Sequence, residues 1–377
     1  MRLLYPLLWS RPDRKACRAQ TMGTAAALAR RGVAVTLLMP QGPDDPSIGA
    51  DDLRAYFEVA GDFRLIQRAS RWGGESALRQ LMWLRQVFRD PVRRETDLLY
   101  SRVPAMLAVG GRAPLPFATD HYRPWPDDLP AIRPLIRRTA RNPKCLGLVL
   151  HSAYAAASYE RAGVDPAKLL VAHNGADAAR PTSGSVQLPA GRPIALYAGR
   201  INAAKGLDEI LRLADLRPDI LFVLAGSEGE GPIEAEAATR TNVRIIPWQA
   251  PGALPAWLAA ADVLLIPPSR APLEQFRNCV LPLKLFAYLA AGKPILAPVA
   301  PDTAELLRDG ENALLVAPGR PDLASVALDR ILEETGLAAR LSANAKCSAA
   351  TLTWDHRAEK IAAFLEARLS APNKRGR

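Results

Sequence analysis

A helix that begins beside a proline and carries a lysine in its first turn points most directly to chemistry in this sequence. In segment 282–294, apolar residues recur at spacings of three and four before Gly292, which predicts a helix that starts near Pro282 and ends at Gly292. The first turn of a helix presents unpaired N–H groups and a partial positive charge, and Lys284 adds a full charge. The segment therefore predicts a site for a phosphate-bearing ligand.

A second cationic segment follows the predicted strand 194–197. Gly199 allows the backbone to turn sharply, and Arg200 and Lys205 then share one loop. Two fixed cations could neutralise a diphosphate, with roughly 1.5–3 kcal/mol from each charge-assisted hydrogen bond. The spacing is equally compatible with two solvated loop cations.

An acid and an imidazole follow the short predicted strand 117–119. Asp120 and His121 could act on a sugar hydroxyl, since the pKa of histidine is the nearest to neutrality. A structural role for His121 is the alternative. We expect His151 and His173 to pack or cap, and His356 to lie on a solvated helix.

Strand and helix signals alternate along the chain and predict parallel sheets with helices on both faces. The predicted strands are 3–8, 33–39, 65–67, 97–101, 117–119, 147–151, 169–172, 194–197, 220–225, 243–247, 263–267, 295–297 and 313–316. The predicted helices are 21–31, 77–88, 154–162, 207–214, 231–238, 255–261, 283–291, 303–307, 321–334, 338–350 and 355–369. Residues 178–192 have no periodicity and predict a linker. The fold class is α/β, with two doubly wound Rossmann-like domains facing a central cleft, where ligands of such sheets bind.

Length and composition agree with a two-domain soluble protein. The chain has 377 residues, more than one core usually supports, and 49% of them are hydrophobic. No apolar run reaches the ~18 residues of a membrane span, and residues 1–10 resemble a first strand more than a signal peptide. The four cysteines are far apart, without metal-ligand or disulfide spacing, so we expect a reduced, cytoplasmic setting.

The positive charge is concentrated in the first half. Residues 1–180 contain 27 Lys and Arg against 17 Asp and Glu, whereas residues 181–377 contain 22 against 21. A basic first half favours an anionic partner, such as acidic lipid or a phosphorylated substrate.

A series of motifs in a fixed order resembles a known family. The motifs are Tyr197–Arg200 with Lys205-Gly206, Leu224–Ser227, Ala261–Pro267, Pro282–Pro294, Asp309–Val316 and Thr353-Trp354, preceded by Arg31–Val35 and His173–Asp177. They resemble the retaining glycosyltransferases of family 4, also called glycosyl transferases group 1, which have the GT-B fold. The likeness is strongest in 194–355.

The resemblance implies a transferase that takes a sugar from a nucleotide-sugar donor with retention at the anomeric carbon. No cofactor or metal is required, because fixed cations and a helix N-terminus stabilise the diphosphate leaving group. It implies an acceptor-side domain over 1–180, a donor-binding domain over 181–354, a final helix over 355–370 that packs back on the first domain, and a basic tail over 371–377.

The resemblance also assigns residues. Arg200 and Lys205 match the pair that holds the diphosphate, and Asp120 and His121 match a segment near the sugar. The remaining donor-site residues are Gly199 in the cationic loop, Gly226 and Ser227 in a turn, Trp248 and Gln249 at the base, and Leu283 and Lys284 at the helix start.

Two acidic residues of the family are absent. The family usually carries two glutamates eight residues apart, and here these positions are Cys279 and Ala287. An unpaired ribose hydroxyl would cost about 1–3 kcal/mol if buried dry. We hypothesise that Glu274, just upstream, supplies the missing acceptor.

Two basic stretches could contact the acceptor or a membrane. Residues 76–89 mix Trp, Leu and Phe with spaced arginines, and residues 133–141 contain four more. Basic amphipathic helices can lie on anionic membranes. The alternative is a helix whose apolar face packs against the core and whose arginines lie on its solvent-exposed face.

The prediction is therefore a cytoplasmic glycosyltransferase that could attach peripherally to the inner face of the cytoplasmic membrane. It would act on a glycan or lipid-diphosphate-linked acceptor in cell-surface polysaccharide biosynthesis. The alternative is a catalytically degenerate GT-B protein that binds a nucleotide or glycan without turnover. Nucleic-acid binding has no supporting pattern. A nicotinamide dehydrogenase is disfavoured, because no Gly-x-Gly-x-x-Gly follows the first strand.

Overall fold

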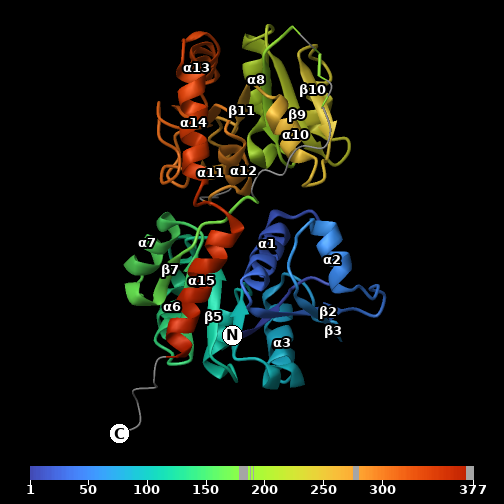
Figure 1. Ribbon diagram of the computed structural model, residues 1–377, viewed down its shortest axis with the longest axis vertical. Coiled ribbons are helices and arrows are strands. Elements are labelled where there is room, and N and C mark those ends of the chain that lie inside the picture. The colour runs from blue at the N-terminus through green and yellow to red at the C-terminus, as the bar shows by residue number, and fades with distance from the viewer. Residues whose placement is uncertain (178–185, 187, 190, 275–279, 371–377) are drawn as a thin grey trace. The chain divides into compact units, whose positions relative to one another are not determined.

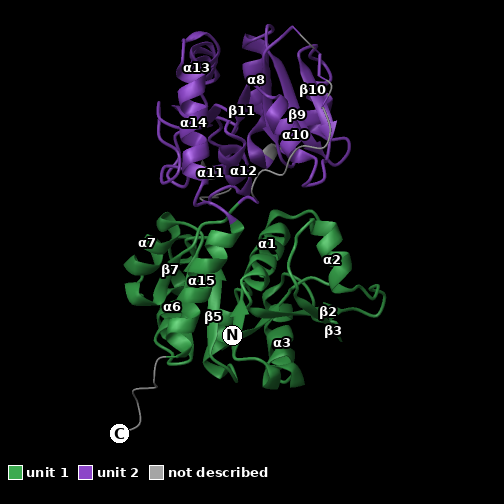
Figure 2. Ribbon diagram, in the orientation of Figure 1, with its two compact units in different colours: residues 1–175, 354–377 green, residues 176–353 purple. Residues whose placement is uncertain are grey.

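Two separate parallel sheets organise the chain. The computed structural model describes residues 1–177, 186, 188–189, 191–274 and 280–370, without the side chains of residues 203, 273 and 274. Unit 1 comprises Met1–Gly175 and Trp354–Arg377, and unit 2 comprises Ala176–Thr353 (Figure 2). Each unit contains one sheet, which confirms the predicted α/β architecture of two Rossmann-like domains.

The sheet of unit 1 has seven strands in the order β3-β2-β1-β4-β5-β6-β7. The strands are β1 (Arg2–Pro6), β2 (Ala34–Gln41), β3 (Arg64–Ala69), β4 (Leu98–Ser101), β5 (Phe117–His121), β6 (Cys145–Leu150) and β7 (Leu169–Val171). The main helices are α1 (Ala16–Arg30), α2 (Ala50–Phe57), α3 (Ala77–Val87), α6 (Arg133–Ala140), α7 (Ala153–Arg161) and α15 (Trp354–Leu369), with short α4 (Met106–Val109) and α5 (Trp125–Asp128). Strands β5 and β6 are buried along their whole length, as expected for a parallel sheet covered on both faces.

The sheet of unit 2 has six strands in the order β10-β9-β8-β11-β12-β13. The strands are β8 (Ile194–Ala198), β9 (Leu221–Ser227), β10 (Val243–Pro247), β11 (Val263–Leu265), β12 (Ile295–Pro298) and β13 (Leu314–Val316). The helices are α8 (Leu207–Leu216), α9 (Pro232–Ala237), α10 (Leu254–Ala260), α11 (Ala271–Glu274), α12 (Leu283–Ala291), α13 (Pro321–Glu333) and α14 (Leu337–Ala349). Strand order reverses between β8 and β11, and ligands of doubly wound sheets bind at such a switch point.

The last helix of the chain belongs to unit 1. α15 lies beside α1 and against β6 (Figure 1). Gly23 of α1 makes this contact close, because a Cβ there would lie 2.7 Å from the indole Cε2 of Trp354. A larger side chain at position 23 would therefore separate α1 from the start of α15.

Local sequence explains both ends of α12. Pro282 is the N-cap in an extended conformation, and Gly292 is the C-cap with φ of 60°. The predicted helix 283–291 is confirmed.

The predicted helix 303–307 is wrong, since these residues form turns. The backbone N–H groups of Leu306 and Leu307 both bond to the carbonyl oxygen of Thr303, so the segment closes a turn and does not continue as a helix.

Helix α3 faces the core of unit 1. Trp83, Leu84 and Val87 are buried in one apolar cluster with strands of the sheet. The apolar side of this helix is therefore unavailable to a bilayer, which removes the main reason to predict membrane contact through residues 76–89. None of the described helices combines the length and apolar composition needed to cross a membrane.

Candidate functional site

Two glycines allow the carboxyl ends of β8 and β9 to come together. Gly226, the sixth residue of β9, has φ of +129°, and a Cβ there would lie 2.3 Å from the carbonyl oxygen of Gly199. Gly199 itself has φ of +146° just after β8. Because any side chain at position 226 would push these backbones apart, the pair fixes the shape of the loop that carries Arg200 and Lys205.

Two buried tyrosines hold the same loop. The Tyr197 hydroxyl donates a hydrogen bond of 2.9 Å to the carbonyl oxygen of Arg200. The Tyr288 hydroxyl, from α12, accepts one of 2.7 Å from the backbone N–H of Ala198. The loop is therefore tied both to its own strand and to the helix that carries Lys284.

Three cations gather at this point. The Lys284 ammonium nitrogen lies 3.3 Å from the centre of the Tyr197 ring. Burial and the charge of Lys205 hold the pKa of Lys284 well below its usual value. Burial and the charge of Arg200 likewise lower the pKa of Lys205. The three groups therefore repel one another, and an anion bound among them would relieve the repulsion.

Negative charge in the described residues does not balance this cluster. Arg200 pairs with Glu228 at 3.3 Å, and both side chains are about 40% exposed. No described carboxylate forms an ion pair with Lys205 or Lys284. The site therefore has the electrostatics of an anion site at the switch point of the sheet, beside the start of α12.

The other predicted donor residues surround this loop to different degrees. Gly226 and Ser227 end strand β9 and do not form the predicted turn. The Ser227 hydroxyl lies 2.8 Å from a carboxylate oxygen of Glu234. Trp248 and Gln249 follow β10 as predicted, but the Gln249 side-chain oxygen accepts from the Trp257 indole at 3.0 Å.

The remaining predicted donor residues concern α12 and the loop before it. Leu283 is the first residue of α12 and packs with Ala287 against an apolar cluster. The side chain of Glu274 and the whole of Cys279 lie outside the described residues. A ribose contact by Glu274 therefore stays a prediction.

Asp120 lies inside β5 and not beyond its end as the sequence predicted. Its carboxylate is fully buried and lies 2.6 Å from the ring of His151 and 2.8 Å from the guanidinium of Arg357. The Tyr100 hydroxyl donates to it at 2.6 Å. Burial pushes the pKa of Asp120 upward, but the charge of Arg357 and the His151 contact hold it well below its usual value. These contacts give Asp120 a structural task, and its catalytic role stays a prediction.

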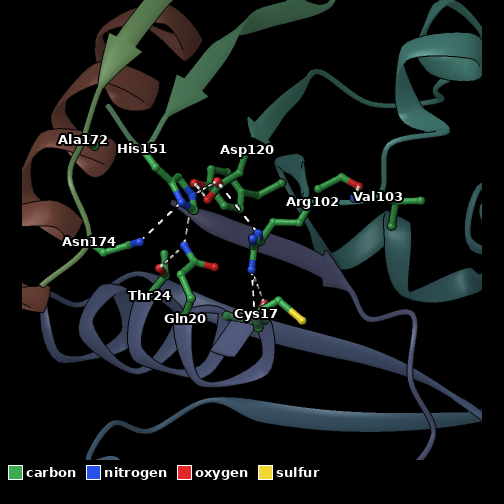
Figure 3. A network of polar contacts seen from close by, with 12 residues as sticks. Cys17, Gln20, Thr24, Arg102, Val103, Asp120, His151, Ala172 and Asn174 are labelled. Carbon is green, nitrogen blue, oxygen red and sulfur yellow. Dashed lines mark hydrogen bonds and ion pairs between the residues drawn. The ribbon is translucent and has the colours of Figure 1, made fainter. Parts of the chain in front are cut away.

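Figure 3 shows how this network is arranged, with Asp120 of β5 and His151, the residue after the adjacent strand β6, pointing toward each other. Gln20 of α1 contacts one ring nitrogen of His151 at 3.3 Å, and Asn174 contacts the other at 3.4 Å. His151 is thus a buried structural residue, as expected. Arg357 was not predicted, although it falls on the apolar stripe of α15, where a charge requires a buried partner.

His121 lies beside this network. Its ring is buried and stacks on Tyr159, with 5.8 Å between ring centres, and burial lowers its pKa to about 4. Its Nε2 atom has no hydrogen-bond partner within the described part of the chain. A neutral imidazole with an unused nitrogen could orient a hydroxyl, so the predicted role stays chemically possible.

Comparisons with known proteins agree with this geometry. The family model described as glycosyl transferases group 1 matches residues 181–347, and that described as glycosyltransferase family 4 matches residues 20–180. The D-inositol 3-phosphate glycosyltransferase of Actinosynnema mirum is 31% identical over 229 residues, 54% of this chain and 53% of that protein. The corresponding enzyme of Mycolicibacterium paratuberculosis is 28% identical over 216 residues, 53% of this chain and 47% of that protein. The chain thus spans about half the length of the curated relatives it matches.

Solved structures share the fold over nearly the whole chain. HepE from Anabaena, in complex with UDP-glucose, has a TM-score of 0.70 at 17% identity, covering 97% of this chain and 100% of that one. Sucrose-phosphate synthase from Thermosynechococcus elongatus has a TM-score of 0.76 at 18% identity, covering 98% and 99%. Both units therefore have the architecture of the GT-B fold. Since the two family models together span most of the chain, from residue 20 to residue 347, the protein belongs to glycosyltransferase family 4, the group 1 glycosyl transferases.

Proposed function

We propose that this glycosyltransferase moves a sugar from a nucleotide-sugar donor to a glycan or lipid-linked acceptor, with retention of anomeric configuration. The observation that carries the proposal is the cluster of Arg200, Lys205 and Lys284, whose charge is not balanced by described acids. A donor diphosphate would supply the missing negative charge.

Each part of the cluster has a role in this mechanism. Negative charge grows on the diphosphate as the bond to the sugar breaks, so cations already in place stabilise the transition state more than the ground state. The N-terminus of α12 adds the partial charge of its first turn. No metal is needed to neutralise the leaving group, so EDTA is expected to leave turnover unchanged.

Unit 1 is proposed to bind the acceptor. His121, neutral at physiological pH, would orient a hydroxyl of the sugar or of the acceptor. The positive charge of the first half favours an acceptor that carries phosphate, such as a lipid-linked diphosphate. Such an acceptor fits a role in making cell-surface polysaccharide or glycoconjugate at the cytoplasmic face of a membrane.

The arginines of α6 support contact with an anionic membrane. Arg137 and Arg138 of α6, and Arg141 just after it, are exposed and line an open surface pocket of about 520 Å³ with Pro134 and Asn142. Cations near an anionic bilayer contribute ~1 kcal/mol each. Flotation with phosphatidylserine vesicles, and none with neutral vesicles, is expected. Triple replacement of the three arginines by glutamine should abolish flotation, and equal flotation would remove the proposal.

A panel of UDP-, GDP-, ADP- and dTDP-sugars tests the donor. HepE was solved with UDP-glucose, so UDP-glucose is the first donor to test. A bound donor raises the melting temperature by an amount that grows with the logarithm of its concentration divided by its Kd. Products formed with acceptor glycans are then analysed by NMR, where an inverted anomeric configuration would contradict retention.

The alternative is a protein that binds a nucleotide sugar without turnover. Ala287 favours it, because this position cannot hold the ribose with a carboxylate. A melting-temperature rise without hydrolysis or transfer of any donor would support this alternative.

Turnover at wild-type level after Glu274→Gln would show that Glu274 does not replace the missing acid.

A further inference from the structure

The Tyr197 side chain contacts two of the three cationic residues in different ways. Its ring lies under the Lys284 ammonium at 3.3 Å, and its hydroxyl holds the carbonyl of Arg200 at 2.9 Å. Tyr197 itself is fully buried at the end of β8. One side chain therefore connects strand β8, the loop after it and helix α12.

The Lys284 ammonium is confined between this ring and the loop. A Cβ at position 199 would lie 2.7 Å from the Lys284 nitrogen and 3.2 Å from the Tyr197 hydroxyl. The ammonium thus lies directly beside the Gly199 backbone. Since no described acid pairs with Lys284, the aromatic face of Tyr197 is the contact that sets its position.

We infer that Tyr197 is a positioning residue of the donor site: its ring sets the Lys284 ammonium, and its hydroxyl sets the backbone of Arg200, so that both cations meet one diphosphate. This inference rests on the proposed function, because it assigns a diphosphate to the cluster. Tyr197 does not contact the donor itself and acts through the two cations.

The second tyrosine of the loop provides a matched control. Tyr288 is also buried and bonds to the backbone of Ala198, but its contact with the loop does not involve Lys284. A Tyr288→Phe variant removes a hydroxyl that fixes the same loop and leaves the ring under Lys284 intact. Tyr159→Phe in unit 1 controls for loss of a buried hydroxyl in the other unit.

Binding of UDP to the full-length protein by isothermal titration calorimetry tests the inference. Tyr197→Leu should raise the Kd at least tenfold, because the ring is lost. Tyr197→Phe should keep the Kd within about threefold, because the ring remains. Its kcat should fall, because the loop that carries Arg200 loses the hydrogen bond from the tyrosine hydroxyl. A wild-type Kd for Tyr197→Leu, or an equal loss in Tyr197→Phe, would overturn the role of the ring.

A double-variant cycle separates positioning from general damage. If Tyr197 acts through Lys284, then Tyr197→Leu combined with Lys284→Met should bind UDP no more weakly than Lys284→Met alone. Additive losses would contradict the inference. Melting temperatures of all variants show whether each one folds, and Tyr197→Phe keeps the test valid if Tyr197→Leu does not.

Chemical labelling examines the same contact without a donor. Acetic anhydride labelling at pH 7.5, quantified by mass spectrometry, should modify Lys284 at least threefold more in Tyr197→Leu than in wild type, because the covering ring is gone. Tyr159→Phe should label like wild type, and Tyr288→Phe should label less than Tyr197→Leu because the Tyr197 ring still covers Lys284. Unchanged labelling in Tyr197→Leu would refute the contact. If no nucleotide binds wild type but the labelling difference is found, the proposed donor fails while the Tyr197–Lys284 contact holds.

Discussion

The guanidinium of Arg357, on the last helix of the chain, lies 2.8 Å from the carboxylate of Asp120 in the first sheet, and both side chains are completely buried. Arg357 also donates to the carbonyl oxygen of Ala172, shortly before the chain leaves unit 1. It lies three residues after Trp354, where the chain re-enters unit 1. Arg357 therefore ties the start of α15 both to β5 and to the end of the first segment of unit 1.

Replacing Arg357 should destabilise unit 1 strongly. Arg357→Met leaves the Asp120 carboxylate buried without its main cation, and removing one partner of a buried ion pair costs about 3–5 kcal/mol. The free energy of unfolding from urea denaturation measures this. Arg30→Ala breaks the pair between Arg30 and Asp355 on the same two helices, whose side chains are 28% and 59% exposed, and should cost less than about 1 kcal/mol. Equal losses in both variants would contradict the structural role of Arg357.

Stability should fall as the pH drops from 6.5 toward 4. Burial lowers the pKa of His121 to about 4 in the folded protein, against 6.5 for an unperturbed histidine. Between these values the unfolded chain binds a proton that the folded protein does not. The contribution of His121 to stability is therefore fully present above pH 6.5 and is lost by up to about 1.4 kcal/mol per pH unit below it.

Urea denaturation at pH 7.5, 6.5 and 5.5 checks this dependence. His121→Gln should reduce the slope without abolishing it, because burial also lowers the pKa of His151. A slope in His121→Gln equal to that of wild type would show that His121 does not titrate in this range.

Removing the charge of Lys205 should lower turnover at least tenfold. The expected loss corresponds to about 1.4 kcal/mol of transition-state stabilisation, the effect of one cation on a leaving diphosphate. Steady-state kinetics of Lys205→Ala with the donor found in the panel measures it. Arg212→Ala, an exposed cation on the neighbouring helix α8, is the control and should keep wild-type kcat. Unchanged kinetics in Lys205→Ala would exclude it from the diphosphate site.

A methyl group at position 226 should disrupt the proposed donor site. Gly226→Ala places a Cβ 2.3 Å from the Gly199 carbonyl oxygen and must separate the ends of β8 and β9, so UDP affinity should fall at least tenfold. Gly229→Ala is the control, because it has a similar φ of +147° but no atom within 4 Å of the added carbon. Calorimetry compares the two variants. An equal effect of both would assign the loss to backbone strain and not to crowding of the loop.

The sequence by itself determined the elements and the residue types of the proposed donor site. Alternating apolar runs gave the two parallel sheets, and Pro282 and Gly292 set the bounds of α12, because capping depends on neighbouring residues only. The order of family motifs placed Arg200, Lys205 and Lys284 in one site. Short segments such as 303–307 were predicted wrongly because local preference is weak at that length.

Only the tertiary structure decided the partners of the buried charges. Asp120 and Arg357 are 237 residues apart, and nothing local indicates that α15 returns to the first sheet at that point. Lys284 and Tyr197 likewise meet because α12 follows β11, which is the neighbour of β8 in the sheet. Residue types determine which side chains require a partner when buried, but strand order determines which partner lies within reach.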